Sequence, residues 1–369
     1  MNKPHSKLLA FNKIFMELNK KFGYKVACDW LKNEWDGHFY LHDANSSTYV
    51  PYSYKGTEVI TVLYKGKLLL TSFEQLYDLV EEDIELLSEE DQAFCKYTNE
   101  LEVLDKDNKW VKVLRVIRKP KTKDFHFIKS SNGLTEIVTS NHPVITSNGD
   151  KDAKDVTIED KIISELPDIN FGNKTEIYCL DYLNPNRAKY FRGKLFEGGD
   201  THQEGQVCYF NATNPLQNKL ICDFNLGWLV GMIIAEGSFS HDSICIHQSE
   251  GKIFDRVVEI CEEKNLGYHI YQKNSYKGRE TGAIVIRNQV FCDVFENAFS
   301  NKEISYNKKL NPDILDYNKE FLKGIIGGIL DGDGYISKNS KKRIHIQNTS
   351  RTLINQLAYI IRLFGYTVR

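Results

Sequence analysis

The stretch GWLVGMIIAEG (Gly227–Gly237) decides the fold, because the chain repeats its pattern as GIIGGILDGDG (Gly324–Gly334). In each copy the small residues fall at positions i, i+4 and i+8, so they line one side of a helix. A stripe of this kind lets two helix backbones approach closely. A glycine inside a helix costs roughly 1 kcal/mol relative to alanine. Its repetition at matched positions, 97 residues apart, indicates two helices that pack on each other; two unrelated core helices are the alternative.

Each repeated helix ends with an acidic residue followed by glycine, Glu236-Gly237 in the first copy and Asp333-Gly334 in the second. If the glycine stripes face each other about a pseudo-twofold axis, the two carboxylates emerge side by side. Neighbouring carboxylates repel unless a positive charge lies between them. Mg²⁺ bound by one or two carboxylates and a phosphate is a common arrangement. The repeat therefore predicts a magnesium site at Glu236 and Asp333, with phosphodiester hydrolysis as its chemistry.

The repetition continues downstream of the two helices. At an offset of 98 residues, Ile246-His247 corresponds to Ile344-His345 and Gly267-Tyr268 to Gly365-Tyr366, so one insertion explains the change of offset. An α+β domain with an internal repeat is expected over residues 221–369. About 75 residues separate Gly237 from Pro312, whereas 35 follow Gly334. The second copy is therefore expected to be truncated.

Three segments alternate strictly between apolar and polar residues, and each is expected to be a strand with one buried face. They are Ser243–Ser249, Gly282–Asn288 and Arg343–Thr349, and the isoleucines expected in the core are Ile244, Ile246, Ile284, Ile286, Ile344 and Ile346. The opposite face presents side chains able to reach base edges and phosphates, namely His247, Arg287, Arg343, His345 and Gln347. An ordinary solvent-facing side of a sheet gives the same pattern. The cluster Lys341-Lys342-Arg343 adds local positive charge.

The two motifs LVGMIIAEG and IGGILDGDG resemble the paired signature of LAGLIDADG, or DOD-type, homing endonucleases. The resemblance implies that the last acids, Glu236 and Asp333, bind metal, and that the sheet lies in the major groove of double-stranded DNA. The earlier acid of the pattern is Asp331 in the second copy but Ile234 in the first, so that position is expected to be dispensable.

The stretch Lys309-Leu310-Asn311-Pro312 resembles the Lys-x-x-Pro of the same family. By this resemblance Lys309 stabilises the phosphate or polarises the attacking water, both electrostatic roles. A solvated surface lysine beside Lys308 is the alternative interpretation.

The N-terminal half of the chain is predicted to be mainly β. Short apolar segments punctuated by Gly, Asn and Asp run from Glu58 to Ile163, with one Glu-rich and Leu-rich helical interruption at about Ser72–Phe94. Thr139-Ser140-Asn141-His142 resembles the T-x-x-H block of inteins, the self-splicing Hint fold. Ala153–Asp160 resembles the A-x-x-L-x-x-G-D block, with Glu159 in place of glycine.

Ser53 stands where the resemblance places the start of an intein. There a hydroxyl attacks the preceding carbonyl carbon in an acyl shift, and Thr139 and His142 are expected to assist, with the histidine protonating the leaving nitrogen. The closing His-Asn pair and the downstream acceptor are absent, so completed splicing is not expected. A turn serine and a loop histidine are the alternative interpretations.

These observations predict a multidomain chain. Residues 1–52 form a host-protein segment, 53–165 the N-terminal part of a Hint-like splicing domain, 166–220 a connecting or accessory segment, and 221–369 a C-terminally incomplete endonuclease domain. Within the host segment, Gly37–Tyr52 resembles part of class III anaerobic ribonucleotide reductase.

The composition of the chain bears on three further questions: whether it is globular, where it could bind DNA, and whether it binds zinc. Hydrophobic residues make up 41% and charged residues 27%, which is an ordinary globular balance. The net charge of −2 means that any DNA-binding charge must be local. The eight cysteines contain no C-x-x-C pair, which argues against zinc. No secretory signal or membrane-spanning stretch is recognisable, so a soluble, cytoplasmic monomer is expected. The alternatives are a non-cleaving LAGLIDADG-derived binder such as an RNA maturase, or a fragment of an oxidoreductase.

Overall fold

The computed structural model describes residues 20, 38–43, 53–88, 93–105, 107–119, 124–131, 133, 135–164, 166–186, 188–190, 204–209, 214–240, 242–249, 251–276, 279–303, 305–337 and 343–368. The chain divides into two compact units, Met1–Asp168 with Ala358–Arg369, and Ile169–Leu357. Both strands and helices are present, as expected for a multidomain chain of mixed structure. Residues 166–168 group with the first unit, and the rest of the predicted connecting segment groups with the repeated helices in the second.

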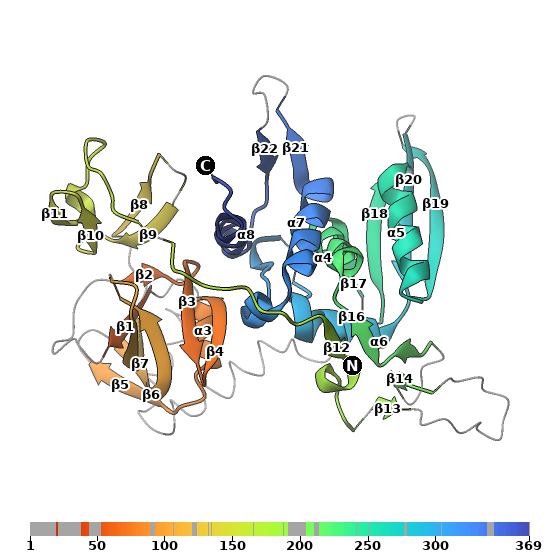
Figure 1. Cartoon of the computed structure of the whole chain (residues 1–369), viewed down its shortest axis with the longest axis horizontal. Coiled ribbons are helices and arrows are strands. Elements are labelled where there is room, and N and C mark those ends of the chain that lie inside the picture. The colour runs from red at the N-terminus through yellow and green to blue at the C-terminus, as the bar shows by residue number, and fades with distance from the viewer. Residues whose placement is uncertain are drawn as a thin grey trace. The chain divides into compact units, whose positions relative to one another are not determined.

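The first unit is built on a nine-stranded antiparallel sheet with the order β4-β3-β6-β7-β1-β2-β9-β8, in which β5 also pairs with β6 (Figure 1). Its strands are β1 His38–Asp43, β2 Tyr54–Lys55, β3 Val59–Tyr64, β4 Lys67–Ser72, β5 Ile84–Ser88, β6 Ala93–Leu104, β7 Trp110–Lys119, β8 Phe125–Lys129 and β9 Thr135–Thr139. The hairpin β10 Pro143–Thr146 and β11 Gly149–Asp152 and the 3₁₀ turn Ala153–Asp155 follow. Strand β1, which lies in the predicted host segment, pairs with β2 and β7.

Between the described strands β4 and β5 of this unit lies the helix α3 (Phe73–Leu79). Ser72 and Gln75 form a reciprocal capping box at its start, which satisfies two otherwise unpaired N–H groups. The predicted helical interruption at Ser72–Phe94 was too long. Its second half is the strand β5, which pairs with β6, so tertiary pairing overrides the helical preference of its Glu and Leu residues.

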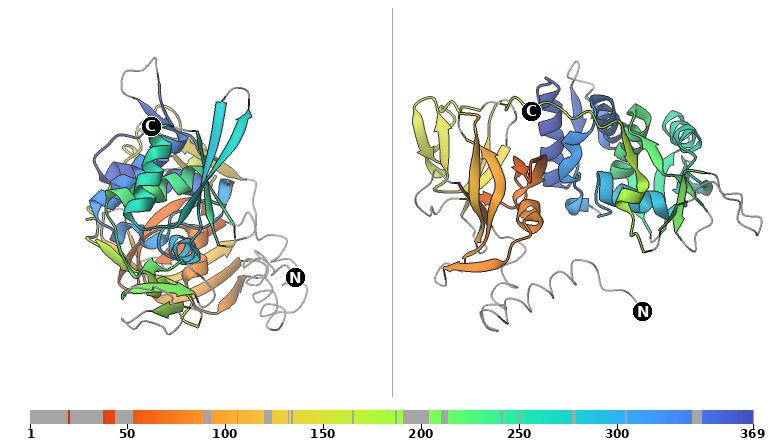
Figure 2. Two further views of the ribbon diagram at one scale, coloured as in Figure 1. Left: turned by 90° about the vertical axis from the view of Figure 1, so that its right-hand side faces the viewer. Right: turned by 60° about the horizontal axis from the view of Figure 1, so that its bottom comes forward.

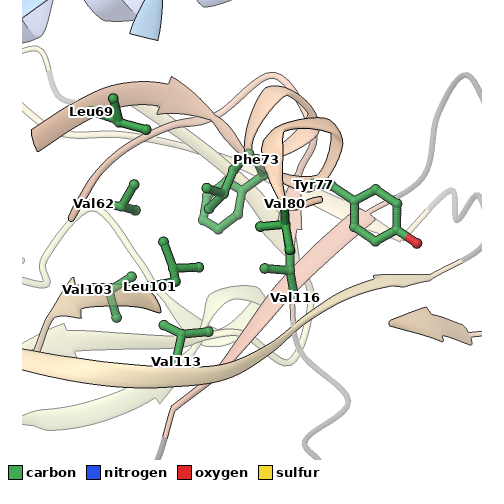
Figure 3. Packing of buried hydrophobic residues seen from close by; sticks show 10 residues of the cluster. Val62, Leu69, Phe73, Tyr77, Val80, Leu101, Val103, Val113 and Val116 are labelled. Carbon is green, nitrogen blue, oxygen red and sulfur yellow. The ribbon is translucent and has the colours of Figure 1, made fainter. Parts of the chain in front are cut away.

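The core of the first unit lies between α3 and the strands β3, β4, β6 and β7. Figure 3 shows side chains of this cluster pointing toward one another. Its buried members are Val62, Leu69, Phe73, Leu76, Tyr77, Val80, Leu101, Val103, Val113 and Val116. Valines dominate the strand side of the cluster, in keeping with the fit of β-branched side chains to a pleated surface.

The second unit contains the repeated helices α4 (Phe224–Glu236) and α7 (Lys319–Asp333), which lie side by side (Figure 1). The first copy continues with β17 Gly237–Phe239, β18 Ile244–Ser249, α5 Lys252–Glu263, β19 Tyr268–Tyr276 and β20 Arg279–Ile286. The second continues with β21 Gly334–Ile336, β22 Ile344–Ile346 and α8 Arg351–Leu363, whose residues are shared between the two units. In Figure 2, β19 and β20 form a long hairpin drawn in cyan.

Shorter elements surround these copies. They are β12 Glu176–Tyr178, a 3₁₀ turn Cys179–Tyr182, β13 Ala188–Tyr190, β14 Gln206–Tyr209, β15 Leu216–Gln217, β16 Lys219–Ile221, α6 Gln289–Val294, a π-turn Phe295–Phe299, and 3₁₀ turns Ser305–Asn307 and Pro312–Asp316. β12 pairs with β16, and β13, β14 and β15 form a small sheet. The predicted connecting segment therefore carries secondary structure. No helix in the described part of the chain has the length and apolar character needed to cross a membrane.

The two copies differ in their sheets. In the first, β17-β18-β20-β19 form a four-stranded sheet, and Ile244, Ile246, Ile284 and Ile286 are fully buried as predicted. In the second, β22 pairs only with β21 among the described residues. Ile344 is 58% exposed, so its predicted place in the core was wrong; among the described residues, no strand corresponding to β20 pairs with β22.

Strand pairing also corrects the register of the repeat. Gly237 pairs with Ile246, and Gly334 pairs with Ile346. Ile346 is therefore the counterpart of Ile246, and the predicted match of Ile246 with Ile344 was wrong. More residues separate β21 from β22 than separate β17 from β18. The extra residues are offset by a shorter stretch further along the second copy, so a nearly constant offset between the copies does not reveal them.

Candidate functional site

The two repeated helices begin and end in the same way. Asp223 accepts a hydrogen bond from Leu226 N, and Asn318 accepts from Glu320 N and Phe321 N, so each helix has a side-chain cap. Glu236 and Asp333 are the last helical residues. The following glycine begins a strand in each copy, and a Cβ there would lie 2.3 Å from the carbonyl oxygen four residues earlier. Glycine thus permits the abrupt change from helix to strand directly after each acid.

The glycine stripes bring the two helix backbones into contact. A Cβ on any of four glycines would overlap a carbonyl oxygen of the facing helix: Gly227 meets Phe321 at 2.1 Å, Gly324 meets Phe224 at 2.3 Å, Gly231 meets Ile325 at 2.1 Å and Gly328 meets Trp228 at 2.0 Å. These contacts are reciprocal. Each glycine and each carbonyl residue of one helix stands 97 positions from its counterpart in the other, so Gly227 meets Phe321 as Gly324 meets Phe224. The predicted close packing of the two helices is confirmed.

The contact extends to the acids. A Cβ on Gly332 would lie 2.5 Å from Ala235 Cβ and 3.3 Å from Glu236 Cγ, so the end of α7 lies against the end of α4. Glu236 is partly buried, and burial, followed by the nearby charge of Asp333, raises its pKa above the ordinary value of 4.5. The two predicted metal-binding carboxylates therefore lie close enough to interact electrostatically.

Lys308 lies beside this pair of carboxylates. Its Nζ donates to the carbonyl oxygens of Ile234 at 2.6 Å and Ala235 at 3.1 Å, at the C-terminal end of α4. Burial lowers the pKa of Lys308, and the charges of Asp333 and Glu236 oppose that shift. Sequence reasoning singled out Lys309 instead, and the only signal for Lys308 was its position next to that residue.

Lys309 has a different backbone environment. Its N–H donates to Asn301 Oδ1 at 2.9 Å, in the segment that leads to Pro312. Its proposed catalytic role stays a prediction.

Asp333 has a partner that sequence reasoning missed. Asn348 Nδ2 donates to Asp333 Oδ2 at 3.0 Å, and the backbone N–H of Gln347 lies 3.5 Å from the Asp333 carbonyl oxygen. The strand register, which sets Gly334 opposite Ile346, brings Asn348 to the acid. A correct pairing of the second hairpin would have been needed to find it.

The earlier acid of the second motif connects the helices. Trp228 Nε1 donates to Asp331 Oδ2 at 2.7 Å, and the guanidinium of Arg256 lies 4.3 Å from the centre of the Trp228 ring. Trp228 is only 1% exposed. Asp331 was predicted to be dispensable because the first copy has Ile234 there, yet in this chain it satisfies the buried indole N–H.

The predicted DNA-contacting residues lie at exposed or partly exposed positions on the two copies. His247 Nε2 lies 3.4 Å from both Ser238 Oγ and Cys245 Sγ. Arg287 donates to Tyr271 Oη at 2.6 Å. The register of the strands puts Arg287 and His247 on the same face of the sheet. In the second copy His345 stacks on Tyr335, with ring centres 4.8 Å apart.

Arg343 and Gln347 are exposed, whereas Lys341 and Lys342 lie outside the described residues. Their proposed role in DNA binding, like that of His247, Arg287 and His345, stays a prediction.

In the first unit, Ser53 and Thr139 are joined although 86 residues separate them. Ser53 N donates to Thr139 Oγ1 at 2.9 Å, and Thr139 N donates to Ser53 O at 3.0 Å. His142 N donates to Thr139 O at 2.9 Å, and Ala153 N to His142 O at 2.8 Å. The candidate splicing residues named from separate motifs are thus brought together.

The imidazole of His142 is buried. Its ring lies edge-on to Tyr54, with ring centres 4.4 Å apart, and burial lowers its pKa to about 4. Ser53 is fully buried as well. A histidine with this pKa is neutral near pH 7.

Residues 320–369, which include most of α7 and all of β21, β22 and α8, match the family described as the LAGLIDADG-like domain. This match supports the homing endonuclease family, whose members bind DNA and act as nucleases.

Two curated proteins are similar to longer parts of the chain. The DNA-directed RNA polymerase subunit Rpo1C of Methanocaldococcus jannaschii is 23% identical over 280 residues, which is 71% of this chain and 29% of that protein. The ATP-dependent DNA helicase Hel308 of Thermococcus kodakarensis is 26% identical over 155 residues, which is 39% of this chain and 13% of that protein. The chain thus spans less than a third of the length of either relative.

Proposed function

We propose that this chain carries an intein-borne homing endonuclease that makes magnesium-dependent double-strand cuts in DNA, with Glu236 and Asp333 as metal ligands. The observation that carries the proposal is the reciprocal glycine packing, which brings two helix-terminal carboxylates together beside Lys308. The match of residues 320–369 to the LAGLIDADG-like domain supports the same function. The two copies would be related by a pseudo-twofold axis along the helix pair, within one monomer.

The donor set fits a hard divalent cation. Carboxylate oxygens are the ligands that Mg²⁺ prefers, and burial together with the nearby charge of Asp333 raises the pKa of Glu236. A cation between the two groups would offset this repulsion. When bound, magnesium would supply a Lewis acid and lower the pKa of a coordinated water.

Lys308 is the best-placed positive side chain for the reaction. Its ammonium is fixed by two backbone carbonyls at the end of α4, near the charges of Asp333 and Glu236. A preorganised charge of this kind stabilises negative charge that develops on a phosphate in the transition state. We assign this role to Lys308, and Lys309 is the alternative.

The outward faces of the two copies would hold the DNA. His247, Arg287, Arg343, His345 and Gln347 combine base-reading and phosphate-binding side chains. The Tyr271 hydroxyl restrains the guanidinium of Arg287, which lowers the entropy lost on binding. Phosphate contacts by these residues would make the affinity fall with salt.

The first unit would supply the N-terminal splicing elements. In the acyl shift, Ser53 Oγ attacks the carbonyl carbon of Tyr52, an ester bond forms, the peptide C–N bond breaks, and the hydroxyl proton passes to the nitrogen of Ser53. Thr139 Oγ1 accepts from that nitrogen and so orients the leaving group. His142 is neutral near pH 7. It would pass a proton on during the acyl shift and would not carry a positive charge beforehand.

The comparisons fit a segment inserted into unrelated hosts. The two relatives are named for different activities, an RNA polymerase subunit and a helicase, and the chain matches 29% and 13% of them. Here the host would be an anaerobic ribonucleotide reductase, on the resemblance of Gly37–Tyr52.

The endonuclease is tested with the full chain, Mg²⁺ and a plasmid that carries the reductase-like gene joined without the inserted segment. Linear plasmid is the expected product. Glu236→Gln and Asp333→Asn should each abolish cutting while DNA binding persists in a gel-shift assay. Retained cleavage by both variants would refute the assignment.

The splicing elements are tested separately with hydroxylamine, which cleaves an ester but not a peptide bond. The full chain should release a fragment that ends at Tyr52, and Ser53→Ala should release none. Equal release from both proteins would contradict Ser53 as the nucleophile.

A further inference from the structure

The two carboxylates of the proposed metal site are held differently. Asp333 Oδ2 accepts a hydrogen bond from Asn348 Nδ2 at 3.0 Å. No side chain in the described ranges donates a hydrogen bond to the Glu236 carboxylate, whose neighbours Lys308 and His247 act on it through charge. One acid is therefore oriented by a directional contact, and the other is not.

The amide of Asn348 is itself fixed at both ends. Its Oδ1 accepts from the backbone N–H of Ser350 at 2.9 Å, while its Nδ2 points to Asp333. A flipped amide would set an oxygen against the carboxylate and an NH₂ against an N–H donor, so both contacts select the same orientation. The donor that faces Asp333 is thus determined by the network around it.

Ser350 anchors this arrangement to the fold. It is fully buried, its Oγ accepts from Leu353 N at 3.2 Å at the start of α8, and its hydroxyl donates to the carbonyl oxygen of Lys308. The buried Ser350 therefore contacts both the amide of Asn348, through its N–H, and the backbone carbonyl of Lys308, through its hydroxyl. A side chain held this firmly can set the orientation of the group that it contacts.

We infer that Asn348 is a positioning residue of the proposed endonuclease: its hydrogen bond to Oδ2 of Asp333 would fix the orientation of the carboxylate that binds the cation. The inference rests on the proposed metal site. A carboxylate that is already oriented loses less conformational freedom when it binds a metal. Partners that orient a ligand in this way typically contribute 10- to 100-fold in metal affinity.

The repeat gives Asn348 a counterpart of different length. Because Ile346 corresponds to Ile246, Gln248 stands at the matching position in the first copy. Its side chain has one more methylene group, and the carboxylate it would serve belongs to Glu236, which is itself one methylene longer than Asp333. The two copies therefore differ in the amide side chain at this position as well as in the acid.

The test measures binding of Mn²⁺, as a stand-in for Mg²⁺, to the full chain without DNA by electron paramagnetic resonance. Asn348→Ala should weaken the binding by about tenfold. Thr349→Ala is the matched control: Thr349 is the exposed neighbour of Asn348, so its truncation leaves the contacts of Asn348 in place and the affinity should stay within about twofold of the parent chain. Thermal unfolding, measured in parallel without metal, shows whether each variant is folded.

Three outcomes overturn the inference. Unchanged affinity in Asn348→Ala, with binding lost in Asp333→Asn, would leave the metal site standing and remove the positioning role. Equal weakening by Asn348→Ala and Thr349→Ala would assign the effect to a general disturbance of this turn. Unchanged binding in both Asp333→Asn and Glu236→Gln would instead show that the proposed metal site is wrong.

Discussion

The two copies of the repeat agree in their helices and differ in almost everything attached to them. α4 and α7 share their caps, their glycine contacts and the acid-glycine end. The sheets differ: β18 pairs with β20 and its Ile244 is fully buried, whereas Ile344 on β22 is exposed. The acids differ as well, with Asn348 bound to Asp333 and Lys308 and His247 near Glu236.

This difference shows where the repeat is constrained. At the helix pair each backbone touches the other, so a side chain added to either copy disturbs both. Around the acids, the hydrogen bond of Asn348 to Asp333 joins two residues of the second copy, so it can differ without a matching change in the first. The chain is therefore symmetric where two backbones meet and asymmetric where single side chains act.

The largest expected effect comes from breaking the helix contact. Gly328→Ala would place a Cβ 2.0 Å from the Trp228 carbonyl oxygen, and backbone cannot move aside as a side chain can. We expect the free energy of unfolding to fall by about 3 kcal/mol, at the upper end for overpacking. Urea unfolding followed by tryptophan fluorescence measures the change.

The neighbouring Gly327→Ala is the matched control. Its Cβ would meet Trp228 Cδ1 at an ordinary 3.5 Å, so the better helix propensity of alanine should raise the stability by about 0.5–1 kcal/mol. Equal effects at the two positions would show that the glycine stripe does not hold the helices together.

The second effect separates the two lysines. Lys308→Met should lower the cleavage rate by about 100-fold, the typical cost of losing one preorganised electrostatic contact in a transition state. Lys309→Met should change it by much less, and single-turnover cleavage at saturating Mg²⁺ compares the two. A larger loss in Lys309→Met would favour the lysine chosen by sequence motif over the one chosen by geometry.

What the sequence could predict follows the same division. The spacing of Gly227 and Gly231 is local, and close packing of α4 on α7 follows from it. The place of Glu236 at a helix end follows equally. Lys308 and Asn348 could not be found in this way. Lys308 reaches the acids because of how its loop folds back onto the end of α4, and Asn348 because of the pairing register of β21 and β22.

The same reasoning explains the wrong predictions. Whether Ile344 is buried depends on a neighbouring strand, which its own alternating pattern cannot reveal. The Glu and Leu residues after Leu79 favour a helix locally, but β6 pairs with them as strand β5. In the first unit, by contrast, ordered motifs were enough to name Ser53, Thr139 and His142, which lie together because two strand ends meet.

A third, smaller effect tests the hydrogen bond between Trp228 of α4 and Asp331 of α7, the acid for which the first copy has Ile234. Trp228→Phe keeps an aromatic ring under Arg256 but removes the indole N–H that donates to Asp331. We expect this hydrogen bond to account for about 1 kcal/mol of the free energy of unfolding, because Asp331 is exposed and solvent replaces part of the bond; the volume lost from the buried ring adds to the cost of Trp228→Phe alone. A double-mutant cycle with Asp331→Ala isolates this contact; strictly additive losses would mean that it contributes nothing.

The smallest effect is a pH dependence that sharpens the contrast between the two acids. Burial and Asp333 raise the pKa of Glu236 in the folded chain above the ordinary value of 4.5. A raised carboxyl pKa means that the folded state binds the proton more tightly than the unfolded state. Its contribution to stability is present below the unfolded pKa and is lost as the pH rises through the folded pKa.

In EDTA, the parent chain should therefore lose stability relative to Glu236→Gln as the pH rises from about 4 to 7, as measured by urea unfolding. Mg²⁺ should reverse this loss at neutral pH, because a cation that binds the ionised pair stabilises the folded state. If the stability difference between the two proteins stays constant across this range and does not respond to Mg²⁺, the carboxylates neither repel each other nor share a metal. The helix ends would then be alike in sequence but not coupled in function.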